Sequence, residues 1–71
     1  MLPLSEEQKA RFGLELATLR QEHADLDAAI SAMMAARVGD QMSIQRLKKK
    51  KLAIKDRIVE LEDLVLPDII A

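Results

Sequence analysis

Apolar side chains recur at alternating steps of four and three residues along two long stretches of the chain. The first stretch carries Phe12, Leu16, Leu19, His23, Leu26, Ile30 and Met33, in which His23 is the one polar member. The second carries Ile44, Leu47, Lys51, Ile54, Ile58, Leu61 and Val65, in which Lys51 has the same role. This spacing keeps each set on one side of an α-helix, as in the a and d positions of a coiled coil. The pattern predicts two amphipathic helices.

Short local signals predict where these helices begin and end. Ser5 is followed three residues later by Gln8, which is the spacing of a capping box at a helix N-terminus. Gly39 fits the position after the last residue of a helix, where a left-handed backbone is common. Asp40 or Ser43 then fits the cap of the second helix.

Two heptad helices joined by a short turn form an antiparallel hairpin. Pro67 ends the second helix, because proline lacks the amide hydrogen and clashes with the preceding turn. The prediction is an all-α protein, an antiparallel two-helix coiled-coil hairpin that forms a single domain over residues 1–71. Its parts are helix one (about 6–37), a turn (about 38–42), helix two (about 43–66) and a short C-terminal tail (67–71). Pairing about Val38 and Gly39 sets the facing positions: Met33 with Ile44, Ile30 with Leu47, Leu26 with Lys51, His23 with Ile54, Leu19 with Ile58, and Leu16 with Leu61.

The short length of the chain predicts that the hairpin needs further support. A chain of 71 residues lies near the lower limit for a self-sufficient core, and this one has no cysteine for a disulfide. Helix two carries a second apolar row, Leu52, Val59 and Leu66, which is spaced by seven residues and lies off the hairpin seam. Exposed rows of this kind promote association. We therefore expect a homo-oligomer, a dimer or larger, in which the hairpins form a helical bundle and this row is the interface.

One segment of the second helix concentrates the positive charge of the chain. Of the eleven basic residues, seven lie between Ile44 and Ile58: Arg46, Lys48, Lys49, Lys50, Lys51, Lys55 and Arg57. They are candidates for an interaction with nucleic acid, an anionic membrane or an acidic protein. A formal net charge of -1 disfavours a dedicated polyanion binder, whose domain is normally strongly basic. The segment also lacks aromatic side chains on which bases could stack. We expect a solvated face that pairs with acidic residues of helix one and of a partner subunit.

Three polar residues are assigned to the hairpin seam. His23 occupies a core position and is expected to be largely buried and hydrogen-bonded to a carboxylate, with Asp56 preferred over Asp27. Lys51 occupies an a position, where a polar residue fixes the helix register at a cost in stability. Its long stem is expected to lie along Leu26 while the ammonium group reaches the edge of the seam.

The sequence offers no motif for catalysis or for a cofactor. A hairpin has no obvious concave pocket, and one histidine without cysteine cannot build a usual zinc site. We expect no enzymatic activity, no metal and no cofactor. The first seven residues contain no basic n-region and no apolar run, and no segment approaches the ~20 apolar residues of a membrane span. A cytoplasmic protein without a signal peptide or membrane span is therefore expected.

Two signatures in the sequence resemble a known family. The first reads Leu19-x-x-Glu22-His23-x-x-Leu26-Asp27-x-x-Ile30, and Asp40 follows it. The second is Leu47-Lys48-Lys49-Lys50-Lys51-Leu52-Ala53-Ile54-Lys55-Asp56-Arg57-Ile58. Together they resemble the YdcH-like family, small bacterial proteins that form helical hairpins and are classed as a domain of unknown function. The resemblance covers roughly residues 12–60 and implies the hairpin fold, but it implies no activity.

These observations predict a small structural or adaptor module that acts through protein–protein contacts. The first alternative is a nucleic-acid-associated protein that uses the basic segment 46–57. A further alternative is a protein that uses the same segment to bind an anionic membrane or an acidic protein.

Overall fold

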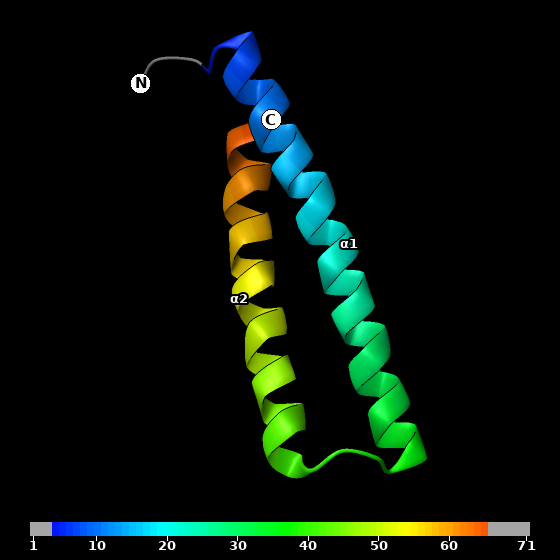
Figure 1. Ribbon diagram of the computed structural model, residues 1–71. Coiled ribbons are helices and arrows are strands. Elements are labelled where there is room, and N and C mark those ends of the chain that lie inside the picture. Colours follow the sequence, from blue (N-terminus) through cyan, green and yellow to red (C-terminus); the bar gives the residue numbers. More distant parts are fainter. Residues whose placement is uncertain (1–3, 66–71) are drawn as a thin grey trace, which may run out of the picture.

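Two long helices and a short loop make up the part of the chain that can be described. A computed structural model describes residues 4–65 and contains α1 (Glu6–Ala36) and α2 (Gln41–Val65), which run antiparallel (Figure 1). Within these residues there is no strand. The predicted helical hairpin is confirmed. The expected stop at Pro67 and the tail 67–71 lie outside the described residues.

The first helix begins with the hydrogen bonds that its sequence predicts. The backbone N–H of Gln8 donates to Oγ of Ser5 at 3.1 Å, and the backbone N–H of Ser5 donates to Oε1 of Gln8 at 2.9 Å. These reciprocal bonds satisfy two amide groups that have no partner inside the helix. Glu6 and Glu7 in the first turn add favourable charge at the positive end of the helix dipole.

Helix α1 ends at Ala36, close to the predicted end at about residue 37, but its left-handed cap lies two residues before the predicted one. The left-handed residue that ends the helix is Arg37, with φ 56° and ψ 36°, whereas Gly39 was expected in that role. The N–H of Arg37 donates to the carbonyl of Met34, and the N–H of Val38 donates to the carbonyl of Met33. This pair of bonds forms a Schellman motif. Gly39 also has a positive φ of 84°, so the loop contains two left-handed residues.

The cap of α2 is Asp40, which settles the choice between Asp40 and Ser43. The backbone N–H of Ser43 donates to Oδ1 of Asp40 at 2.6 Å. This backbone hydrogen bond is the main cause that holds the pKa of Asp40 below its ordinary value of 3.8, and hydrogen bonding from the Ser43 side chain adds to it. Because Asp40 is the cap, α2 begins at Gln41 and not near residue 43 as predicted.

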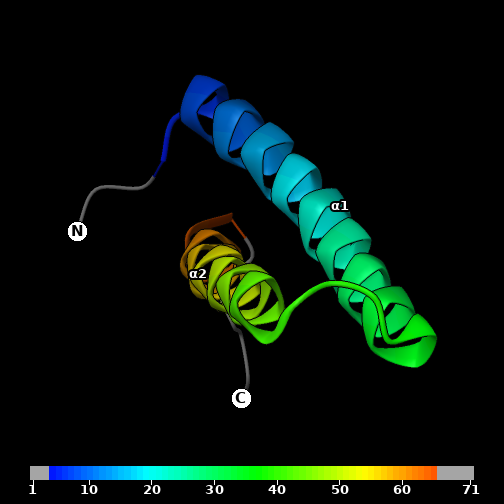
Figure 2. The same cartoon turned by 60° about the horizontal axis from the view of Figure 1, so that its bottom comes forward.

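The hydrophobic core lies mainly in the half of the hairpin away from the loop. Buried apolar side chains from both helices form one cluster: Leu16, Ile54, Ile58 and Leu61, with Phe12, Leu19 and Leu26 packed against it. Ile30 is also buried, but Met33, Ile44 and Leu47 near the loop are only half-buried. The ribbons in Figure 1 separate toward the loop, and Figure 2 shows the two helices as inclined neighbouring rods. The buried residues of both helices are thus predicted seam residues, and their burial decreases toward the loop.

Candidate interaction surface

Three ion pairs join the two helices across the edges of the seam. Glu15 accepts from Nε of Arg57 at 2.9 Å, and Glu62 accepts from Arg20 at 2.9 Å. The third pair joins Lys51 to Asp27, also at 2.9 Å. Exposed pairs of this kind contribute little to stability, and they mainly fix the alignment of the helices.

The Glu15–Arg57 pair shifts the titration of both side chains. The hydrogen bond from Arg57 is the main cause that lowers the pKa of Glu15 below its ordinary value of 4.5. The same bond raises the pKa of Arg57 above its ordinary value. Arg57 also reaches Glu60, one helical turn away, at 3.4 Å. This candidate ligand-binding residue is therefore engaged inside the hairpin.

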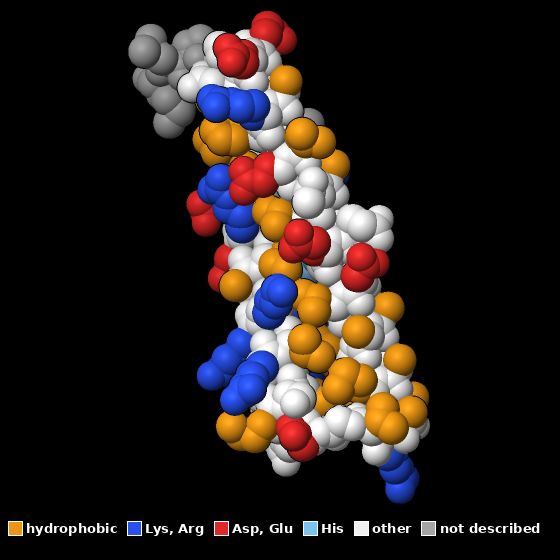
Figure 3. Space-filling view, viewed as in Figure 1, with side chains coloured by type: hydrophobic (Ala, Val, Ile, Leu, Met, Phe, Trp, Pro, Cys, Tyr) orange, Lys and Arg blue, Asp and Glu red, His pale blue; other side chains and the backbone are white. Residues whose placement is uncertain are grey.

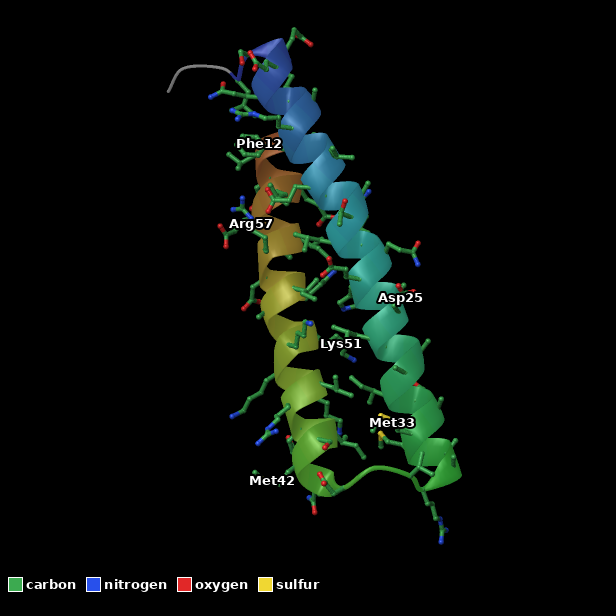
Figure 4. All side chains as sticks on the ribbon, viewed as in Figure 1. Phe12, Asp25, Met33, Met42, Lys51 and Arg57 are labelled. Carbon is green, nitrogen blue, oxygen red and sulfur yellow. The ribbon has the colours of Figure 1, made fainter. Side chains whose placement is uncertain are left out.

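Lys51 is half-buried at the seam, as its position predicts. Figure 4 shows its side chain extending from α2 toward α1, where Nζ meets Oδ1 of Asp27. This hydrogen bond and the charge of Lys51 are the main causes that lower the pKa of Asp27 below 3.8, and His23 adds a smaller effect. Lys51 thus behaves as a polar seam residue with an internal partner.

The expected hydrogen bond between His23 and Asp56 is not present. Among residues 4–65, His23 is half-buried, and none of the side-chain hydrogen bonds joins it to either aspartate. Asp56 is exposed. The predicted alignment placed Asp56 at the right level along the hairpin, but its position in the heptad turns it to the outer side of α2. The nearby acidic side chain is Asp27, whose pKa His23 lowers slightly.

Five members of the basic segment make no ion pair within the part of the chain that the structure describes: Arg46, Lys48, Lys49, Lys50 and Lys55. Figure 3 shows Lys and Arg side chains gathered over the first half of α2, near the loop. Of the acidic residues of α1 expected to pair with the basic segment, Glu22, Asp25 and Asp27, only Asp27 does so among residues 4–65. Asp25 points away from α2 (Figure 4) and accepts a hydrogen bond from Gln21.

Two members of the predicted oligomer interface are exposed on the hairpin. Leu52 is 61% exposed and Val59 is 44% exposed, and they lie two turns apart on the same side of α2. Leu66, the third member, lies outside the described residues. The hairpin therefore leaves a substantial part of both apolar side chains open to solvent.

Two of the three ion pairs between the helices were not predicted from the sequence. Glu15 with Arg57 and Arg20 with Glu62 occupy heptad positions that flank the seam. In the predicted alignment, the two residues of each pair lie about five residues apart along the hairpin axis, a separation that long charged side chains can span. A helical wheel combined with this alignment would have predicted both ion pairs. Leu14 on α1 is also exposed, with 71% of its surface accessible.

Within residues 4–65, no group of three or more His, Cys, Asp or Glu side chains is placed to hold a metal ion. Neither of the two helices is long and apolar enough to cross a membrane.

Comparison with known proteins identifies one family. Residues 16–62 match the family model described as "Protein of unknown function (DUF465)". The match covers most of each helix and the loop between them, including the two signatures noted in the sequence. No curated protein and no solved structure matches the chain.

Proposed function

Because the chain belongs to the YdcH-like family of small proteins of unknown function, we propose a role from its surface: a structural or adaptor module that self-associates through α2. The observation that carries the proposal is the exposure of Leu52 and Val59 on one side of that helix. Contiguous apolar surface on a small protein is a common sign of a protein interface.

The small core of the hairpin supports this proposal. Only five apolar side chains are buried among residues 4–65: Leu16, Ile30, Ile54, Ile58 and Leu61. Domains of this size usually gain stability from a disulfide, a metal or a partner. The chain has no cysteine. A helical partner on α2 would supply the missing apolar burial.

The direct test changes Leu52 and Val59 together to lysine. The double variant should lose its oligomeric mass in light scattering at micromolar concentration, because each lysine would have to be desolvated in the interface. A matched control changes the exposed Leu14 and Met34 of α1 to lysine, which adds the same charge on the other helix. The control should keep the wild-type mass. Equal masses for the wild type and the Leu52/Val59 variant would contradict the proposal.

A second candidate function is association with nucleic acid through the basic segment. The five basic side chains without an internal ion pair favour it. Phosphate binding would release counterions, so affinity for duplex DNA would fall steeply as salt rises. We expect only weak binding at physiological salt, because acidic residues lie nearby and no arginine pair is placed to read bases. Tight, salt-sensitive binding that is lost on changing Lys48, Lys49 and Lys50 to glutamine would reverse this ranking.

The same basic side chains support a third candidate, an anionic membrane or an acidic protein as the ligand. The proposal also takes the protein to be cytoplasmic, bacterial and without catalytic activity. A cysteine-free composition agrees with a reducing compartment.

A further inference from the structure

The outer side of α2 carries charge and apolar surface in a definite order. Leu52 and Val59 lie at its centre, and six charged residues flank them at helical spacing: Lys48, Lys49, Lys55, Asp56, Glu62 and Asp63. We call these eight residues the 48–63 face. It is basic at the end near the loop, apolar in the middle and acidic at the other end. Apart from Lys48 and Glu62, which are half-buried, all of them are exposed.

The charge order of this face is complementary to that of a second copy rotated by 180°. If two copies of α2 pack antiparallel about a point between residues 55 and 56, Leu52 of one copy meets Val59 of the other. The same rotation places Lys49 of each copy beside Asp63 of the other, and Lys48 beside Glu62. A parallel arrangement would instead set Lys49 beside Lys49 and Asp63 beside Asp63. Complementary charge of this kind fixes the orientation of partners more than it adds affinity.

The charge order is not explained by the stability of α2 itself. Residues 41–55 contain six basic residues and no acidic one, and residues 56–65 contain four acidic residues and one basic one. A helix dipole favours the opposite order, with acidic residues near the N-terminus and basic residues near the C-terminus. The first turn of α2 has no acidic residue and the last turn no basic one. The order therefore opposes the dipole and points to a partner outside the helix.

The hairpin as a whole also has a basic half and an acidic half. Residues 22–55, which form the half near the loop, carry seven basic and four acidic side chains. Residues 4–21 and 56–65 carry four basic and seven acidic ones. The molecule is 49 Å long, whereas charges are screened beyond ~8 Å at physiological ionic strength. The excess positive charge of one half and the excess negative charge of the other are therefore too far apart to attract each other within one hairpin. Each can attract the opposite charge of a neighbouring molecule.

We infer that the partner on the 48–63 face is a second copy of this chain in antiparallel orientation, with the loop of each hairpin beside the open end of the other. This inference rests on the proposed function and adds the identity and direction of the partner. The two α2 helices would lie side by side around a two-fold axis, with Leu52 and Val59 of both copies between them and one α1 helix on each outer flank.

Single cysteines test the orientation, because the natural chain has none. In the antiparallel dimer, Asp56→Cys lies beside its own copy across the two-fold axis and should form a covalent dimer on mild oxidation. Lys49→Cys should not, since a rise of 1.5 Å per residue puts its two copies ~20 Å apart, far beyond disulfide reach. An equimolar mixture of Lys49→Cys and Asp63→Cys should give a mixed covalent dimer. Lys50→Cys, on another side of α2, is the control and should stay monomeric on a denaturing gel.

The outcomes separate this inference from the proposed function. A Lys49→Cys chain that links to itself, without mixed dimers with Asp63→Cys, would overturn the antiparallel arrangement while self-association still stands. A wild-type chain that keeps the mass of a monomer in light scattering would overturn both the antiparallel arrangement and self-association. Charge reversal gives an independent check that leaves the apolar centre intact. Lys49→Glu should weaken the dimer, and adding Asp63→Lys in the same chain should restore it. Glu62 is left unchanged in this test because it pairs with Arg20 inside the hairpin. Lys50→Glu, which changes net charge equally off this face, should leave the dimer unchanged.

Discussion

The two glycines that the structure describes have opposite local environments. A Cβ atom added to Gly13, inside α1, would meet no atom within 4 Å. Gly39 has a positive φ of 84°, and a Cβ there would collide with the terminal methyl of Met33. The Met33 side chain can move aside, but the left-handed backbone would remain unfavourable for alanine.

These environments predict opposite effects of one substitution. Gly13→Ala should raise the free energy of unfolding by about 1 kcal/mol, because alanine is the better helix former. Gly39→Ala should lower it by about 1–2 kcal/mol, because alanine does not favour a positive φ. Urea unfolding followed by circular dichroism, at one protein concentration, measures both changes. Equal effects of the two substitutions would show that the loop backbone is not held in this conformation.

At the scale of the helices, the seam combines regular packing with two polar positions. Lys51 has an internal partner in Asp27, but His23 is half-buried without a hydrogen bond to a carboxylate among residues 4–65. The two polar positions thus differ in whether the hairpin supplies a carboxylate partner. Replacing Lys51 leaves Asp27 unpaired, whereas replacing His23 leaves no carboxylate partner unpaired.

His23→Leu should therefore stabilise the hairpin by about 1 kcal/mol, since leucine adds apolar burial at a seam position. Thermal unfolding at neutral pH measures the change. Asp25→Ala is the control, because Asp25 points away from α2 and its replacement should change the unfolding temperature little. A clear loss of stability in His23→Leu would reveal a polar contact that holds the imidazole ring.

The sequence predicts the helices better than it predicts the contacts of single polar side chains. Heptad spacing and the Ser5 capping box are local patterns, so they indicate the two helices and the start of the first. The left-handed residue at the end of α1 was assigned to Gly39 and not to Arg37, because an arginine in a left-handed conformation leaves no signal in the sequence. The pairing of His23 with Asp56 failed for a geometric reason. Alignment along the hairpin says nothing of the direction in which a side chain leaves the helix.

At the scale of the whole molecule, the candidate site was partly predictable. Leu52 and Val59 were found from their spacing by seven, and the structure shows that the hairpin leaves them exposed. The basic segment was found as a block, but only the structure shows that Arg57 and Lys51 are used internally. The partner is inferred by another route, from the order of basic, apolar and acidic residues along α2.

The most direct test of self-association through α2 is the mass of the intact chain in solution. Sedimentation equilibrium over a range of micromolar concentrations should give a mass that rises from 8.0 kDa toward at least twice that value. Mass action requires this rise for a reversible oligomer. A mass that stays at 8.0 kDa at every concentration, with helical circular dichroism intact, would contradict the account.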